Sequence, residues 1–419
     1  MFRLQLSVPL RVLVLAPLAA GACGGSDNPS PPDGGADASR ACTTTTTSGM
    51  GVLQDFCSPA DPGGNGILVT ASGEDLALSG YAFPPATPDD FALVDGWEIH
   101  FDRVLSTFDH VTLSDDPDKS PTDQSQTGAV VAEVDGPFAV DLHKGGPLIG
   151  KGGGDERAVA VGALTGQNKH GNAAFDPTVR YAFGFEIVKA TASAKNINLD
   201  AADLTDYQEM IQKGYTTFLV GTATFKGTAC TSTIAGYDFT KIPTTVHFRF
   251  GYVAPTTYVN AQNPDNDPAA AFPNEEHQRG LHTVQNQSTV AQTTFHIDHI
   301  LWESFVHDSP AHFDPFAAKY AGATTPPTAV LEDFKGYAFK PFVDGLGQPL
   351  PWRSCLARYT PPTTGAMTFD TLGVPVNPTG NPATTIRDFY DYETYNHSTF
   401  GHLNSDGLAF VSRNYPSPP

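Results

Sequence analysis

The sequence is poor in sulfur and in basic side chains, and both shortages exclude classes of function. It has five cysteines and four methionines among 419 residues, too few methionines to favour a thioether site for Cu(I). No two cysteines stand in a CxxC arrangement, which argues against a thiolate zinc centre. Lysine and arginine number 24 against 45 acidic residues, giving a net charge of −21, so we expect no nucleic-acid partner.

Common motifs of exported hydrolases are also absent. The sequence contains neither the GxSxG nucleophile elbow nor the HExxH zinc helix. An enzymatic role is therefore uncertain, and the sequence leans against one. Beyond the N-terminus, no apolar run is long enough to cross a bilayer.

Residues 1–22 have the pattern of an export signal. Two arginines accompany an apolar stretch, and a run of small residues ends at Ala22. Cleavage at this point by an ordinary signal peptidase would release a soluble chain. Residues 18–23 also resemble the lipobox of bacterial lipoproteins, with Ala20 where leucine is commonest. This resemblance implies that Cys23 carries a lipid and, because Gly24 rather than aspartate follows it, that the protein is anchored in the outer membrane, facing the periplasm or the cell surface.

The number of cysteines favours the lipidated form. If Cys23 carries lipid, four cysteines remain to pair in an oxidising compartment, and four allow three connectivities. We predict Cys42–Cys57, which flank a turn-rich segment, and Cys230–Cys355. Residues 23–40 are rich in Gly, Ser, Asp and Pro, as expected of a flexible tether, so the lipid should provide the contact with the membrane.

The remaining sequence predicts a mainly β protein, with β-sandwich-like antiparallel sheets and a few short helices. From Trp97 to Leu113 apolar and polar residues alternate, as in a half-buried strand. Similar runs occupy 67–70, 129–142, 181–188, 216–225, 246–253 and 289–297. Helical patterns occur at 201–213, within 299–306, from Pro315 and at 330–334, with Asp298 and Asp314 as expected N-caps of the second and third.

A polar break at 255–275 suggests a division of the chain. It separates a β-rich domain, residues 41–255, from a region of strands and short helices, residues 256–419, that contains most of the histidines. The alternative is one continuous domain.

Six of the thirteen histidines fall within residues 277–312. Imidazole is a preferred ligand of zinc and Cu(II), and we predict a site for one of these ions formed by His296, His299, His307, His312 and Asp298. His277 and His282 lie in a polar loop, where solvation suffices. His397 and His402 lie in an aromatic-rich loop. Three roles are open for this loop: completing the metal site, lining a ligand groove, or packing in the protein core. Histidines also cap helices and bond buried backbone, so the pattern alone does not establish a site.

Three function classes stay open. The first is a lipid-anchored envelope protein that binds zinc or copper through the histidine cluster. The second is a β-sandwich module that recognises a glycan, a peptide or an envelope partner. The third is a metal-dependent hydrolase, for which Glu303 is the nearest candidate base.

Overall fold

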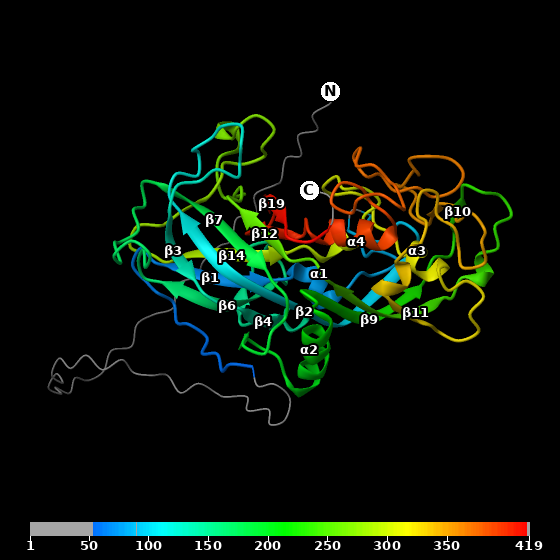
Figure 1. Cartoon of the computed structure of the whole chain (residues 1–419), viewed down its shortest axis with the longest axis horizontal. Coiled ribbons are helices and arrows are strands. Elements are labelled where there is room, and N and C mark those ends of the chain that lie inside the picture. Colours follow the sequence, from blue (N-terminus) through cyan, green and yellow to red (C-terminus); the bar gives the residue numbers. More distant parts are fainter. Residues whose placement is uncertain (1–52, 89, 417–419) are drawn as a thin grey trace, which may run out of the picture. The chain divides into compact units, whose positions relative to one another are not determined.

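A computed structural model describes residues 53–88 and 90–416 (Figure 1). Strands account for 32% of the structure and helices for 14%, which confirms the predicted β-sandwich-like class with few short helices. The signal peptide, Cys23, the tether and Cys42 lie outside the described residues, so those predictions stay predictions. Within the described ranges, no helix combines the length and the apolar character that a membrane span requires.

The smaller of the two main sheets has six strands and is built around β1. In spatial order its strands are β18 (Gly407–Leu408), β17 (Gly401–Leu403), β14 (Thr289–Phe295), β1 (Ile67–Ser72), β6 (Arg157–Leu164) and β5 (Leu148–Ile149). β1 runs antiparallel to β6 but parallel to β14. The sheet therefore joins strands from the beginning and the end of the described chain.

The larger sheet has eleven strands and is organised by the long strand β2. Its main path is β15 (Thr328–Val330), β11 (Thr245–Tyr252), β9 (Thr217–Phe225), β2 (Trp97–Ser114), β7 (Arg180–Ile187), β12 (Thr256–Val259) and β19 (Phe410–Arg413). Side branches are β3 (Val130–Val134), β4 (Phe138–Asp141), β8 (Lys195–Asn196) and β13 (Leu281–His282). A separate pair joins β10 (Thr231–Ser232) to β16 (Arg353–Ser354).

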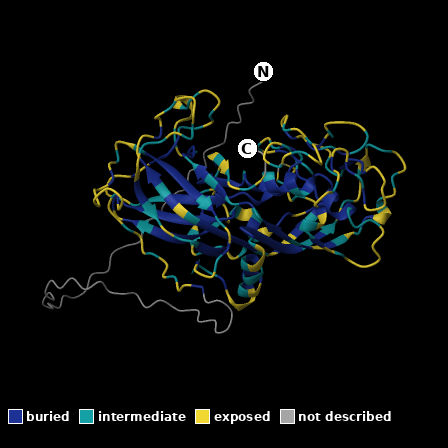
Figure 2. Cartoon of the chain, in the orientation of Figure 1, coloured by how far each residue is buried: buried dark blue, intermediate teal, exposed yellow. Residues whose placement is uncertain are grey.

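Aromatic side chains join the two main sheets. The ring of Phe295, at the end of β14, lies 5.7 Å from that of Phe108 in β2 and 6.0 Å from that of Phe185 in β7. All three rings are fully buried. Burying a phenylalanine side chain contributes about 1.5–3 kcal/mol, so these contacts hold β14 firmly against the larger sheet. The strands are mostly buried, and exposed residues gather in the loops (Figure 2).

In the described part of the chain, four short α-helices and five 3₁₀ turns surround the sheets. The α-helices are α1 (Glu74–Ser79), α2 (Ala201–Lys213), α3 (Asp314–Ala318) and α4 (Phe389–His397), and the 3₁₀ turns are η1 (Leu142–Lys144), η2 (Phe239–Lys241), η3 (Pro268–Ala270), η4 (Ile297–Leu301) and η5 (Leu331–Phe334). α2 packs Tyr207 and Met210 against residues of β2 and β9. Its bounds agree with the predicted helix.

Two predicted helix caps are wrong. η4 begins at Ile297, so His296 and not Asp298 occupies the capping position, and it makes no side-chain cap. α3 begins at Asp314 itself. The carboxylate of Asp314 accepts instead from Trp97 and Arg353, partners distant in sequence that no local pattern reveals.

Both sheets combine strands from the two regions on either side of the polar break. β14 pairs with β1, and β12 pairs with β7. The described residues belong to one compact unit. The disulfide Cys230–Cys355 is present, as predicted. The pairing of Cys57 with Cys42 stays a prediction, because Cys42 lies outside the described part.

Candidate metal centre

The pairing of β14 with β17 brings distant histidines together. In this antiparallel pair His402 stands opposite Thr294, and the backbone NH of His296 donates to Phe400 O at 2.8 Å. The chain then turns directly into η4, which contains His299. His402 therefore lies beside His296 and His299, which come more than 100 positions earlier in the sequence.

A tight loop supplies the fourth histidine. Trp302 bridges to Ala311, and Glu303 N donates to Pro310 O at 3.0 Å. The intervening residues form a loop that places the ring of His307 5.5 Å from that of Trp302. The indole of Trp302 in turn stacks on His299 at 3.7 Å.

The four imidazole rings form one cluster. Ring centroids lie 4.1 Å apart for His296 and His402, 5.2 Å for His299 and His402, 5.6 Å for His307 and His402, and 5.7 Å for His299 and His307. His296, His299 and His402 are buried, whereas the His307 side chain is 24% exposed. The cluster is thus closed by the fold on most sides, with His307 nearest to solvent.

Thr399 determines which nitrogen of two histidines carries the proton. The Thr399 hydroxyl donates to Asn396 O at 2.7 Å, so it acts as acceptor for His299 Nδ1, 2.9 Å away. Its carbonyl oxygen accepts from His402 Nε2 at 3.2 Å. Because a neutral imidazole has one NH and one lone pair, the lone pairs lie on His299 Nε2 and His402 Nδ1.

His307 follows the same rule. Its Nδ1 lies 3.3 Å from the carboxylate of Asp308, which can only accept when ionised, so the lone pair lies on Nε2. His299 Nε2, His402 Nδ1 and His307 Nε2 are all buried atoms without a hydrogen-bond partner. The three residues each offer a ligand nitrogen within 4.8 Å of the others.

The environment keeps the two buried imidazoles neutral. Burial lowers the pKa of both His299 and His402 well below the ordinary value, and the neighbouring histidines lower it further. Near neutral pH these rings therefore present lone pairs rather than protons, which is the form that binds metals.

Asp298 and His296 connect the histidine cluster to two further carboxylates, those of Glu74 and Asp406. Asp298 Oδ2 accepts from Trp302 Nε1 at 3.2 Å, while its buried Oδ1 has no hydrogen-bond partner. Asp298, His296 and His299 offer ligand atoms within 4.8 Å of one another, and a further such group joins His296 to Glu74 and Asp406. Burial and the charges of Asp298 and Glu156 raise the pKa of Glu74 well above its ordinary value.

The structure does not bring the fifth predicted ligand, His312, into this cluster. After Pro310 the chain returns along η4, and His312 N donates to Leu301 O at 2.9 Å. The fully buried imidazole lies between carboxylates, with Nε2 2.7 Å from Glu303 Oε2 and Nδ1 3.7 Å from Asp95 Oδ2. Glu303 also accepts from the hydroxyl of Tyr359 at 2.6 Å, so the candidate base is already occupied by other partners.

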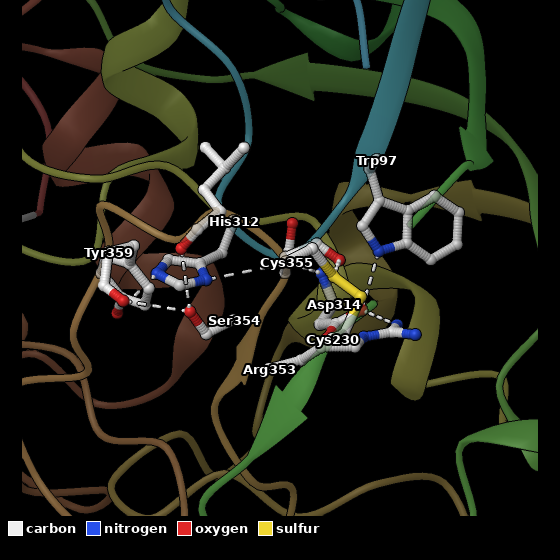
Figure 3. The surroundings of a disulfide bond; sticks show 10 residues. Trp97, Cys230, His312, Asp314, Arg353, Ser354, Cys355 and Tyr359 are labelled. Atoms are coloured by element: carbon white, nitrogen blue, oxygen red, sulfur yellow. Dashed lines mark hydrogen bonds and ion pairs between the residues drawn. A yellow bond between two sulfur atoms is a disulfide. The ribbon is translucent and has the colours of Figure 1, made fainter. Parts of the chain in front are cut away.

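This second network lies beside the disulfide (Figure 3). Asp95 Oδ2 accepts from the backbone NH groups of Phe313 and Asp314 at 2.8 and 2.7 Å. Arg353 Nε donates to Asp314 at 2.8 Å. His312 therefore pairs with Asp95 and Glu303, and Arg353 pairs with Asp314, so His312 has its partners in this network and not in the histidine cluster.

The other histidines singled out in the sequence have separate surroundings. His282 is exposed in β13, and the backbone NH of His277 donates to Gln262 Oε1 at 3.1 Å. His397 is fully buried and stacks on Tyr252 at 4.4 Å. The predicted set of ligands omits His402, which the structure places in the histidine cluster.

Comparison with known proteins adds no relative. The chain matches no protein-family model, no curated protein and no solved structure.

Proposed function

We propose that this protein is an exported, lipid-anchored envelope protein that binds a transition-metal ion through His299, His307 and His402. One observation carries the proposal: His299, His307 and His402, from three separate segments, each offer a ligand nitrogen within 4.8 Å of the others, and each has a buried ring nitrogen without a hydrogen-bond partner among the described residues. An unpaired buried polar atom costs about 1–3 kcal/mol, so leaving three of them together is unfavourable unless something binds there. A cation recovers this cost by accepting all three lone pairs.

The ligand chemistry favours zinc or Cu(II). Neutral imidazole suits both ions, and hydrogen bonds from the second ring nitrogen orient metal-binding histidines in proteins. Thr399 provides such bonds for His299 and His402, and the carboxylate of Asp308 lies 3.3 Å from His307 Nδ1. Three protein nitrogens leave a further coordination position, for which Asp298 is a candidate, because it offers a ligand atom within 4.8 Å of one from His299 and its buried Oδ1 has no hydrogen-bond partner among the described residues. When bound, such an ion would act as a Lewis acid toward any ligand at that position.

Titration of the chelator-stripped protein tests this proposal. We expect zinc and Cu(II) each to bind stoichiometrically in isothermal titration calorimetry, and His402→Gln and His299→Gln to weaken binding at least about tenfold. His282→Gln is the matched control, because this histidine belongs to the same stretch of sequence but is exposed on β13. Absence of stoichiometric binding by the folded wild-type protein would refute the proposed function.

The lipid anchor has its own test. Mass spectrometry of the protein from bacterial membranes should show Cys23 modified by diacylglycerol, and Cys23→Ser should release the protein from the membrane fraction. An unmodified chain beginning at residue 23 would show instead that ordinary signal peptidase removes the leader.

A further inference from the structure

We propose that a second divalent cation binds beside the three-histidine site, held by His296, Glu74 and Asp406 and connected to the first position through Asp298. This inference rests on the proposed function and makes the centre dinuclear. Its ligands come from α1, from the turn before η4 and from the turn after β17.

The first argument concerns two facing acceptors. His296 Nε2 donates to Ser405 O at 2.6 Å, so the lone pair of the neutral ring lies on Nδ1. That lone pair faces Glu74 Oε2 at 3.3 Å. Two acceptors this close require a proton or a cation between them, and two ligands of a tetrahedral zinc ion, each about 2.0–2.1 Å from it, lie roughly 3.3–3.4 Å apart. The observed spacing fits a cation shared by His296 Nδ1 and Glu74. Asp406 Oδ1 lies 3.8 Å from Nε2 of the same ring and belongs to the same group of potential ligands.

The second argument is uncompensated charge. Within the part of the chain described, no lysine or arginine pairs with Glu74, Asp298 or Asp406. Glu156 adds a buried carboxylate, which accepts from Gln292 Nε2 at 2.7 Å. Asp298 is buried as well, and carboxylates buried without a counter-charge are strongly unfavourable. A bound cation would supply the missing positive charge.

The third argument is the free oxygen of Asp298. This residue is only 8% exposed, and its Oδ1 is buried without a hydrogen-bond partner. Asp298 offers a ligand atom within 4.8 Å of ligand atoms of both His296 and His299. Since His299 belongs to the first site and His296 to the second, the Asp298 carboxylate is placed to contact both ions.

The exposure of the proposed ligands allows a cation to enter the second site from solution. Asp406 is 54% exposed and the Glu74 side chain 20% exposed. The second position is therefore nearer to solvent than the three buried nitrogens, and its mixed oxygen and nitrogen ligands suit zinc and related divalent ions.

Zinc stoichiometry of the purified full chain tests the inference. After chelator treatment, reconstitution with Zn²⁺ and removal of excess metal, elemental analysis should find two zinc ions per chain. Asp406→Asn and Glu74→Gln should each lower this number to one and leave the first step of the titration unchanged. Asp406 is the more informative position, because an exposed turn residue can change without loss of the fold. Asp176→Asn, in an unrelated exposed turn, is the control and should retain two.

The outcomes separate the two proposals. One zinc ion in the wild-type chain, unchanged in Asp406→Asn, would overturn the second site and leave the three-histidine site standing. Two ions retained in both carboxylate variants would also overturn it. No bound zinc at all would overturn both proposals together.

Discussion

At the scale of single residues, the proposed metal centre depends on where each histidine carries its proton. Thr399 serves two histidines at once, since its hydroxyl accepts from His299 and its carbonyl from His402. Both bonds leave the lone pair on a buried nitrogen, His299 Nε2 or His402 Nδ1, for which the described residues provide no hydrogen-bond donor. A small hydroxyl residue with no metal-binding role of its own thus prepares two of the three proposed ligands.

Replacing Thr399 by valine should therefore weaken metal binding while preserving the shape of the side chain. The carbonyl contact to His402 remains, but His299 loses the acceptor that fixes its tautomer. We expect zinc affinity to fall about 10–100-fold, the usual effect of removing such an orienting partner. Thr399→Ser restores the hydroxyl and should bind nearly as the wild type does. Equal affinity of the valine and wild-type proteins in calorimetry would contradict this role.

His312, unlike the histidines of the cluster, contributes to the stability of the folded protein through its pairing with carboxylates. Burial alone would lower its pKa, but Asp95 and Glu303 outweigh burial and raise the pKa to about 9. The protonated ring is therefore favoured in the folded state, whereas a histidine in the unfolded chain titrates near 6.5. The resulting stabilisation is complete below about pH 6.5 and disappears as pH rises through about 9.

We therefore expect the free energy of unfolding of the metal-free protein to fall by roughly 3 kcal/mol between pH 6.5 and pH 9.5 through this group. His312→Gln should be less stable near neutral pH, because it leaves buried carboxylates unpaired, but should lose this dependence on pH. Urea unfolding at several pH values measures both effects. His282→Gln should retain the wild-type profile, and a similar decline in His312→Gln would assign the dependence to another group.

At the scale of elements, the sequence predicts strands well because the period-two pattern is local. The described structure contains strands in all seven predicted stretches, with 129–142 divided into β3 and β4. Short helices are harder to predict from the sequence. The predicted helix within 299–306 is the 3₁₀ turn η4, and α1 and α4 carry weak local signals because tertiary packing decides their conformation.

The candidate site was predictable only in part, for the same reason. His296, His299, His307 and Asp298 are close in sequence and do converge. His402 joins them because β17 pairs with β14 in a register that places it opposite Thr294. His312 lies apart from this cluster because it contacts Asp95 and Tyr359, which are distant in the sequence. Strand pairing between distant segments is set by tertiary structure, which spacing in one sequence does not encode.

At the scale of the whole molecule, the Cys230–Cys355 bond encloses most of the centre within one covalent loop. The two cysteines are 125 positions apart, and the segment between them contains β11, β14, η4 and α3. His402, Asp406 and Glu74 lie outside the loop. The centre is therefore assembled from the loop and from chain on both sides of it, held together by the pairing of β14 with β1 and β17.

Removing this disulfide should consequently lower stability without abolishing the metal centre. Closing a loop of this length restricts the unfolded chain, and losing a native disulfide typically costs about 2–5 kcal/mol. We expect the double variant Cys230→Ser, Cys355→Ser to unfold at lower urea concentration by that amount. Its zinc stoichiometry under native conditions should equal that of the wild type, because strand pairing and buried aromatic contacts rather than sulfur position the histidines. A stable, folded double variant that no longer bound zinc would show that the covalent loop itself sets the geometry of the site.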